Sequence, residues 1–177
     1  MTPLIYDAAD EAATAALGAA LAELVPDGTT VALRGTLGAG KTRLVQAVAE
    51  AAGVDRRDVS SPTFVLVHEY HGRRTIYHLD AYRVADLDEF EQLGPDEYFE
   101  GEGITLVEWA DRVEPCLPRE RIDVRIEVTG EHARRFEIWA TGESLCRVVA
   151  RLAGGPLTLA VTRPRAGRAS PGRPACR

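Results

Sequence analysis

The residues best suited to chemistry in this sequence form the run GTLGAGKT, from Gly35 to Thr42. The run fits the pattern G-x-x-x-x-G-K-[ST]. Glycines let the backbone curl so that successive N–H groups face phosphate oxygens, and the positive end of a following helix adds to the attraction. In such loops the lysine, here Lys41, reaches the β- and γ-phosphates, while the next hydroxyl, here Thr42, binds Mg²⁺. The run therefore predicts a site for ATP and Mg²⁺.

Lys41 is also the only lysine in the chain, against 20 arginines. The composition uses arginine wherever an unspecialised cation is sufficient. A position that keeps lysine needs a compact ammonium rather than a planar guanidinium. The count therefore supports a specialised role for Lys41.

Two carboxylates follow apolar runs that read as buried strands. Glu108 ends ITLVE and Asp80 ends HLD. A magnesium site of this kind needs a carboxylate at the end of a second buried strand, which makes Glu108 the second predicted Mg²⁺ ligand. Asp80 is the predicted acid that orients a water or binds the ion through water. The alternatives are a surface acid closing a strand for Glu108, and a cap for the following turn for Asp80.

Thr63 and Trp109 are two further candidates. Thr63 lies in SSPTF, residues 60–64, where nucleotide switches carry a hydroxyl that senses the γ-phosphate, although serine and proline also form ordinary loops. Trp109 directly follows Glu108. Its ring either closes over the nucleotide, presents an aromatic surface to a partner, or fills the edge of the core.

A layered arrangement of strands and helices must hold these residues. Apolar periodicity predicts helices over residues 10–24, 44–52, 86–93 and 143–152, and strands over residues 29–33, 64–70, 75–79, 104–107, 122–128 and 136–140. Strand, loop, helix and further strands indicate an α/β fold. The predicted hairpins, one turning at His71 and Gly72, favour a mixed sheet. We expect a single domain with a P-loop NTPase-like mixed β-sheet flanked by helices.

Charge divides the chain into two parts. All 27 acidic residues lie in residues 1–150, with 15 of the 21 basic residues, so that part carries −12, whereas residues 151–177 carry +6. We predict a P-loop ATPase domain over residues 1–150. Residues 151–177 are predicted to hold the end of the last helix and a disordered tail rich in Arg, Pro and Gly. An acidic body lacks the basic stripe of a nucleic-acid platform.

Several other classes of protein are excluded by the sequence. No apolar run approaches the roughly 18 residues that span a bilayer, and the N-terminus lacks the basic segment of a secretory signal. The three cysteines have neither disulfide nor metal-ligand spacing, and the histidines show no zinc pattern. A cytoplasmic location is the expectation that follows.

Taken together, the motifs resemble those of the TsaE (YjeE) family, the small bacterial ATPases for N6-threonylcarbamoyladenosine modification of tRNA. The resemblance covers roughly residues 10–150 and rests on an ordered set of segments: ATAALG, GTLGAGKT, SPTFVLVHEY, YHLDAYR and ITLVEWADR. It implies ATP and Mg²⁺ as cofactors and slow hydrolysis in a complex with TsaB and TsaD. It also implies that tRNA is contacted only indirectly, because TsaD carries the transfer.

The resemblance also assigns site residues. Lys41, Asp80 and Glu108 become the catalytic residues, and Thr42 and Glu108 the metal ligands. Glu11 and Thr14 would lie by the adenine, and Arg134 reaches the nucleotide. The full predicted nucleotide-binding set is Glu11, Thr14, Leu37, Gly38, Ala39, Gly40, Lys41, Thr42, Arg43, Thr63, Trp109 and Arg134. Thr36 and Arg43 depart from the family pattern, and Arg43 stands where a hydroxyl residue that could face the phosphates is common.

Two other functions share the phosphate loop. A small-molecule kinase needs an acceptor pocket and an arginine-bearing lid, and the sequence offers only Arg73 and Arg74 in a hairpin turn. A nucleotide-gated binding module would bind ATP without meaningful turnover. The leading prediction remains an ATPase subunit of the tRNA-modification machinery.

Overall fold

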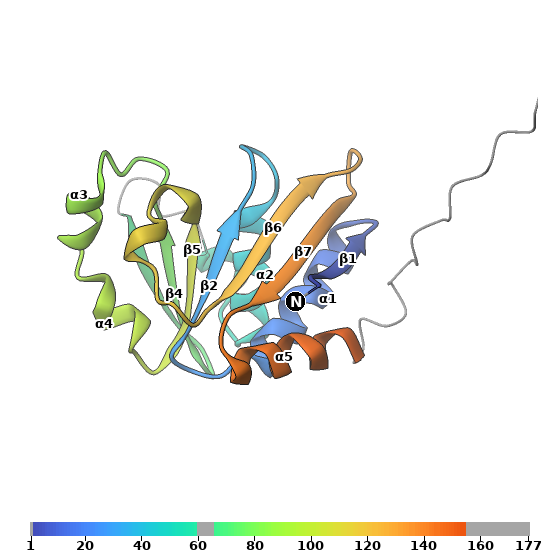
Figure 1. The fold of residues 1–177 in the computed structure, drawn as a ribbon. Helices are drawn as coiled ribbons and strands as arrows, with labels where there is room; N and C mark the ends of the chain where they lie inside the picture. The colour runs from blue at the N-terminus through green and yellow to red at the C-terminus, as the bar shows by residue number, and fades with distance from the viewer. Residues whose placement is uncertain (1, 60–65, 155–177) are drawn as a thin grey trace, which may run out of the picture.

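A seven-stranded mixed β-sheet forms the centre of the molecule in the computed structural model, which describes residues 2–59 and 66–154 (Figure 1). The strands lie in the order β1-β7-β6-β2-β5-β4-β3. Their bounds are β1 Leu4–Ala8, β2 Thr29–Arg34, β3 Val67–His71, β4 Thr75–Asp80, β5 Gly103–Glu108, β6 Ile122–Val128 and β7 Arg134–Ala140. The single-domain α/β fold with a mixed sheet, predicted from the sequence, is confirmed.

The parallel part of the sheet carries the predicted strand ends. Strand β2 pairs in parallel with β5 and β6, and β4 pairs in parallel with β5. Because parallel strands end at the same edge, Asp80 on β4 lies opposite Glu108 on β5. Every residue of β5 is buried, as expected for a strand covered on both faces.

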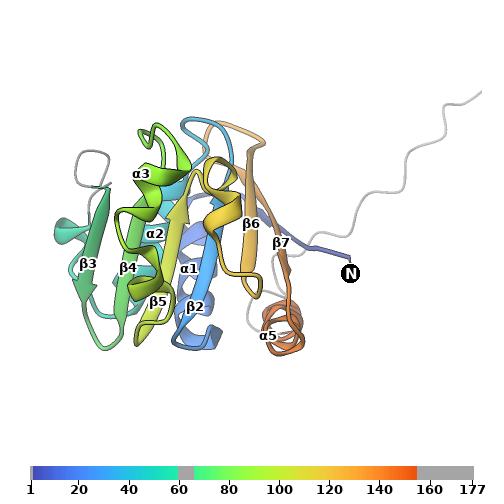
Figure 2. The ribbon, with the colours of Figure 1, turned by 60° about the vertical axis from the view of Figure 1, so that its left-hand side comes forward.

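Helices and short 3₁₀ turns cover the two faces. The helices are α1 Glu11–Leu24, α2 Lys41–Ala51, α3 Leu87–Glu91, α4 Pro95–Phe99 and α5 Glu143–Gly154, and the 3₁₀ turns are Arg56–Asp58, Ala110–Arg112 and Glu114–Cys116. Figure 2 shows α1 and α2 behind the sheet and α3 in front of it. The larger core lies on the α1 and α2 side, and a smaller one joins β4 and β5 to α3 and α4.

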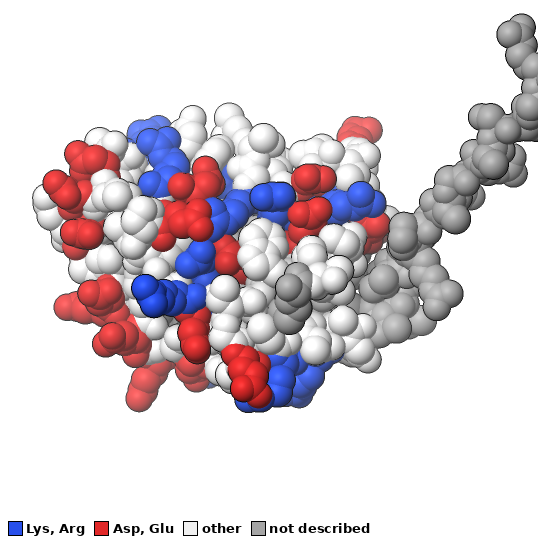
Figure 3. All heavy atoms as spheres, viewed as in Figure 1, with Lys and Arg blue, Asp and Glu red and all other residues white. Residues whose placement is uncertain are grey.

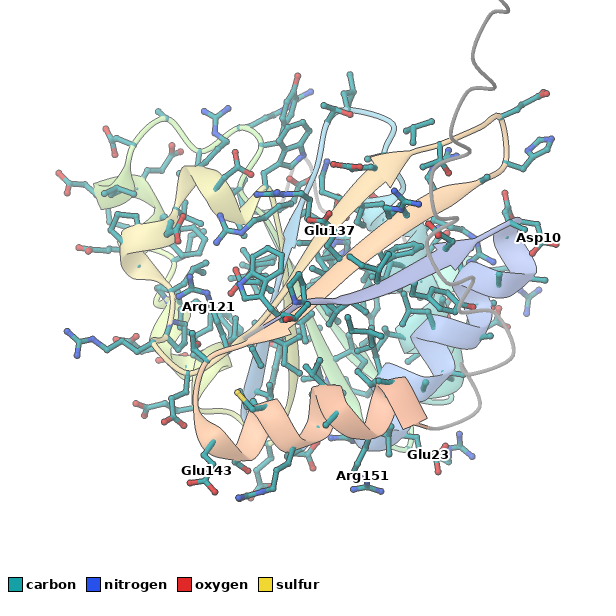
Figure 4. All side chains as sticks on the ribbon, turned by 45° about the vertical axis from the view of Figure 1, so that its right-hand side comes forward. Asp10, Glu23, Arg121, Glu137, Glu143 and Arg151 are labelled. Atoms are coloured by element: carbon teal, nitrogen blue, oxygen red, sulfur yellow. The ribbon has the colours of Figure 1, made fainter. Side chains whose placement is uncertain are left out.

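Helix α1 begins and packs for identifiable reasons. The Asp10 carboxylate, labelled in Figure 4, caps it by accepting a hydrogen bond from the Ala13 N–H at 2.8 Å. Gly18 then lets α1 approach α2, since a Cβ at this position would lie 2.4 Å from the Ala47 Cβ. Helix α2 is thereby held against both α1 and the sheet, with Leu44 and Val48 fully buried. This contact fixes the helix that carries Lys41 and Thr42.

Helix α5 packs against β7, β1 and α1. Figure 4 labels Glu143 in its first turn and Arg151 in its last. Its apolar face, which includes Val148 and Leu152, joins the larger core beside β7, β1 and α1. The helix confirms the predicted segment 143–152 and runs two residues further.

Three elements differ from the sequence predictions. Strand β1 was not predicted: it is a five-residue edge strand that depends on antiparallel pairing with β7. Helix α4 was also missed because it has one turn only. His71 does not form the predicted turn but pairs with Thr75 as the last residue of β3.

Surface charge follows the composition. Acidic side chains gather over α3 and α4 (Figure 3), where the exposed acids are Asp86, Asp88, Glu91, Asp96, Glu97, Glu100 and Glu102. In the described ranges 2–59 and 66–154, no helix has both the length and the apolar character to cross a membrane.

Candidate nucleotide site

The glycine-rich loop, residues 35–40, connects β2 to α2 as the sequence predicts. Gly35, Gly38 and Gly40 have φ values of +148°, +77° and +106°. These lie in the region that favours glycine because other residues meet a steric clash there. At Gly35 a side chain is also excluded by space, since a Cβ would lie 2.6 Å from the Ile126 carbonyl oxygen. The loop conformation therefore depends on the motif glycines.

Helix α2 leaves its first turn open to a ligand. The helix begins at Lys41, and Gly40 in the N-cap position provides no side-chain hydrogen bond to it. The N–H groups of a helix's first turn lack partners within the helix and carry partial positive charge. The start of α2 therefore suits an anion such as a phosphate.

The Lys41 ammonium is buried beside the loop. Its Nζ donates hydrogen bonds to the carbonyl oxygens of Gly35 at 2.8 Å and Thr36 at 3.0 Å. The same Nζ lies 3.6 Å from the ring centroid of Trp109, within range of a cation–π interaction. Burial lowers the pKa of Lys41 below its ordinary value of 10.5, and the nearby Glu108 carboxylate opposes that shift. The cation is thus held at the position where the motif requires it.

Thr42 and Glu108 meet across the gap between α2 and β5. The Thr42 hydroxyl donates to Glu108 Oε2 at 3.0 Å. The other carboxylate oxygen, Oε1, lies 2.8 Å from the Nε2 of His78 on β4. The two predicted metal ligands, 66 residues apart in sequence, are therefore brought together.

Asp80 lies at the same sheet edge as Glu108. Its Oδ1 accepts a hydrogen bond from the Tyr82 N–H at 2.9 Å, so it also caps the turn that follows β4. The turn cap and a role in the site are therefore compatible, because the carboxylate also lines the cavity described next.

A cavity of about 330 Å³ opens between the loop and the strand ends. The predicted residues and one unpredicted neighbour line it together: Leu37, Gly38, Gly40, Lys41, Thr42, Asp80, Tyr82, Glu108 and Trp109. Trp109 has a φ of +58°, unusual for a residue with a side chain, and its ring lies 4.9 Å from the ring of Tyr82. The two aromatic rings form one wall of the cavity.

A second, smaller cavity of about 140 Å³ lies on the other side of Gly40. Glu11, Thr14, Arg43 and Arg134 line it, as expected if these residues surround one end of a nucleotide. The guanidinium of Arg43 pairs with Glu11 at 3.4 Å and with Glu50 at 3.5 Å. These ion pairs engage the side chain that departs from the family pattern.

Arg134 supports the glycine-rich loop from strand β7. Its Nε donates to the Ala39 carbonyl oxygen at 2.9 Å, and its Nη1 donates to the carbonyl oxygens of Gly130 and Ala133. The structure thus assigns Arg134 a contact with the loop backbone. The resemblance implied that Arg134 reaches the nucleotide, which stays a prediction, and it did not imply this contact with the loop.

The donor set fits Mg²⁺ with a nucleotide rather than a metal held by protein alone. Within the described residues no three His, Cys, Asp or Glu side chains cluster as a metal site. Thr42 and Glu108 together offer two oxygen groups beside a phosphate-sized loop. Mg²⁺ prefers oxygen ligands, keeps several waters, and binds through one or two protein ligands plus phosphates. These residues therefore fit the ion that the motif implies.

Two predicted features have a different outcome. Thr63 and the rest of residues 60–65 lie outside the described residues, so that prediction stays untested. The sequence predicts no zinc role for the histidines and assigns none of them to the site, yet His78 directly contacts Glu108. The available signal was strand alternation, which puts His78 and Asp80 on the same face of β4.

Comparison with known proteins identifies a family for this chain. The family described as "Threonylcarbamoyl adenosine biosynthesis protein TsaE" matches residues 8–136. A protein named tRNA threonylcarbamoyladenosine biosynthesis protein TsaE, from Bacillus subtilis, is 42% identical over 142 residues, covering 78% of this chain and 88% of its own length. A protein of the same name from Mycobacterium tuberculosis is 35% identical over 141 residues, covering 74% and 83%.

A solved structure has the same fold. The crystal structure of Bacillus subtilis YdiB superposes with a TM-score of 0.72 and 31% sequence identity. The match covers 86% of this chain and 95% of the YdiB chain. Sequence and structure comparisons therefore point to one family.

Proposed function

This chain belongs to the TsaE family of threonylcarbamoyl adenosine biosynthesis proteins, and we propose that it acts there as a Mg²⁺-dependent ATPase of low intrinsic activity. It binds and hydrolyses ATP while N6-threonylcarbamoyladenosine is formed in tRNA. The observation that carries the proposal is the buried Lys41 ammonium, which lines the same cavity as the Thr42–Glu108 pair.

The loop and helix α2 bind the triphosphate in this proposal. Lys41 exchanges its bonds with the loop carbonyl oxygens for bonds with β- and γ-phosphate oxygens, and the open first turn of α2 adds backbone N–H donors. Thr42 and Glu108 are the residues that would hold Mg²⁺. When bound, Mg²⁺ neutralises charge on the β- and γ-phosphate oxygens.

Asp80 acts on the attacking water. Its buried carboxylate lies opposite Glu108 at the sheet edge and is oriented by the Tyr82 N–H. From there it orients a water molecule, whose oxygen bonds to the γ-phosphorus as the bond from that phosphorus to the β–γ bridging oxygen breaks. The products are ADP and inorganic phosphate. Slow turnover is expected because none of the described residues that line the cavity is an arginine, so no guanidinium is available to neutralise charge at the γ-phosphate.

We propose TsaD and TsaB as the protein partners, since family membership implies work within the threonylcarbamoyladenosine machinery. Contact with tRNA is indirect in this proposal. The acidic surface over α3 and α4 (Figure 3) would repel a polyanion. The proposed location is the cytoplasm.

The structure gives no support to a kinase lid formed by Arg73 and Arg74. Arg73 donates to the carbonyl oxygen of Ala51 at the C-terminal end of α2, and Arg74 to that of Ala22 near the end of α1. Both contacts lie at the far end of these helices from Lys41. An ATPase without a second substrate is therefore favoured over a small-molecule kinase.

Replacing Lys41 by alanine tests the binding site. We expect Lys41→Ala to weaken Mg·ATP binding by about 10- to 150-fold, because a hydrogen bond to a charged group contributes roughly 1.5–3 kcal/mol. Isothermal titration calorimetry with a non-hydrolysable ATP analogue measures this. Arg147→Ala removes an exposed cation on α5 and is the matched control, with unchanged affinity. Equal affinity in wild type and Lys41→Ala would refute the assignment.

Phosphate release separates the candidate activities. Release in proportion to ATP consumed, with no acceptor present, supports an ATPase and excludes a kinase. Negligible release even with TsaB and TsaD present would instead indicate a binding module without turnover. Co-purification with TsaB and TsaD, with and without ATP, tests the proposed partners.

A further inference from the structure

A buried histidine outside the cavity lining contacts the predicted metal-binding carboxylate. The His78 side chain has 0% exposure and that of Glu108 has 4%. His78 Nε2 lies 2.8 Å from Glu108 Oε1, while the Thr42 hydroxyl donates to Oε2. Each oxygen of the carboxylate therefore has its own partner: Thr42, which lines the cavity, and His78, which does not.

The hydrogen bond fixes the tautomer of the ring. An ionised carboxylate only accepts hydrogen bonds, so the proton of a neutral His78 lies on Nε2. Nδ1 then carries no proton and, within the described residues, this buried atom has no hydrogen-bond partner. A buried polar atom without a partner is destabilising, and such atoms in native proteins call for an explanation. Packing alone would favour an apolar side chain here.

The ring orientation is set by a neighbouring aromatic residue. The Tyr70 ring on β3 lies 6.2 Å from the His78 ring at an interplanar angle of 39°. The Tyr70 hydroxyl lies 3.0 Å from His68 Nδ1, so the hydroxyl pairs with His68 and the ring packs beside His78. His78 is therefore oriented by packing, and its one satisfied nitrogen is the one that contacts Glu108.

We propose that His78 is a positioning residue for the magnesium site. By binding Oε1, it prevents rotation of the Glu108 carboxylate and keeps Oε2 directed at Thr42. This inference rests on the proposed function, because it assigns His78 to the site that holds Mg²⁺ with ATP. Mutation of a residue that orients a metal ligand typically lowers metal affinity or activity by about 10- to 100-fold.

Three substitutions of His78 separate positioning from packing. His78→Leu removes the donor and keeps apolar volume. His78→Gln places an amide N–H near the position of Nε2, whereas His78→Asn has the same amide on a shorter side chain that stops near Nδ1. Tyr70→Phe is the matched control, because it keeps the ring against His78 and removes only the hydroxyl.

The primary measurement is metal affinity, which does not require turnover. Electron paramagnetic resonance follows Mn²⁺ binding to the protein with a non-hydrolysable ATP analogue. We expect His78→Leu and His78→Asn to weaken Mn²⁺ binding at least tenfold, His78→Gln to remain within about threefold of wild type, and Tyr70→Phe to be unchanged. Nucleotide affinity without metal should change little in all four variants. ¹⁵N nuclear magnetic resonance of the ligand-free protein should show His78 protonated on Nε2.

Equal Mn²⁺ affinity in the glutamine and asparagine variants would overturn the proposal, even if the leucine variant fails to fold. A ring with a proton on Nδ1 and none on Nε2 would overturn it independently. If the wild type binds neither nucleotide nor Mn²⁺, the proposed function fails instead. In that case the ¹⁵N spectrum of the ligand-free protein still shows whether His78 Nε2 carries the proton that it donates to Glu108.

Discussion

Replacing Gly18 by alanine tests whether the close contact between α1 and α2 supports the site. An added Cβ would lie 2.4 Å from the Ala47 Cβ, and 2.7 Å and 2.9 Å from the backbone atoms Ala47 C and Val48 N. A flexible side chain could move away, but backbone atoms of α2 cannot do so without moving the helix. The substitution therefore forces α1 and α2 apart.

Two opposing effects set the size of the change. Overpacking a well-packed interior costs about 1–3 kcal/mol. Alanine within a helix is favoured over glycine by roughly 0.5–1 kcal/mol, which offsets part of that cost. Because the contact distances are so short, we take the upper end of the first range and expect a net loss of about 2 kcal/mol. For a chain of this length, that corresponds to a fall in Tm of roughly 4–8 °C.

Thermal and urea unfolding measure the stability change, and calorimetry measures Mg·ATP binding. We expect binding to weaken as well, because Lys41 and Thr42 are the first two residues of α2. Gly154→Ala is the matched control: it makes the same substitution in α5, where an added Cβ meets nothing within 4 Å. A Tm for Gly18→Ala equal to or above that of the wild type would refute the packing argument.

Two further predictions concern charged groups. Asp123→Ala should lower the free energy of unfolding by about 3 kcal/mol, because its buried carboxylate accepts hydrogen bonds from both Arg34 and Arg121; an unchanged urea midpoint would contradict this. Mg·ATP affinity should fall with rising pH before pH 10.5 is reached, because burial lowers the pKa of Lys41 and only its ammonium form attracts phosphate. Calorimetry across this range checks it, and constant affinity up to pH 10.5 would be the contrary result.

Local patterns were sufficient to predict the site's strands and loop. ITLV is apolar throughout, and β5 is buried throughout, so Glu108 was correctly placed at a strand end. The glycines of GTLGAGKT predicted a curled loop, and all three have positive φ values. These features depend on a few adjacent residues, which is why sequence alone is sufficient for them.

Features that depend on distant partners were harder to predict. The contact of Arg134 with Ala39 joins residues 95 apart. Strand β1 is short and depends on β7 for its hydrogen bonds, so residues 4–8 carry no strong local signal. His78 lies on a buried strand, where its role depends on the carboxylate of the neighbouring strand. Such contacts follow from the register of the sheet, which no single segment specifies.

The structure also explains why the only lysine lies at position 41. Its ammonium is held between the carbonyl oxygens of Gly35 and Thr36, with the Trp109 ring 3.6 Å away. A guanidinium is wider, has five N–H donors in a fixed plane, and stays charged at any pH. In this buried position most of those donors would lack acceptors, and the desolvated charge could not be relieved by loss of a proton. An ammonium can rotate its three donors between the loop carbonyl oxygens and an incoming phosphate, so the exchange of hydrogen bonds in the proposed ATP binding favours lysine over arginine.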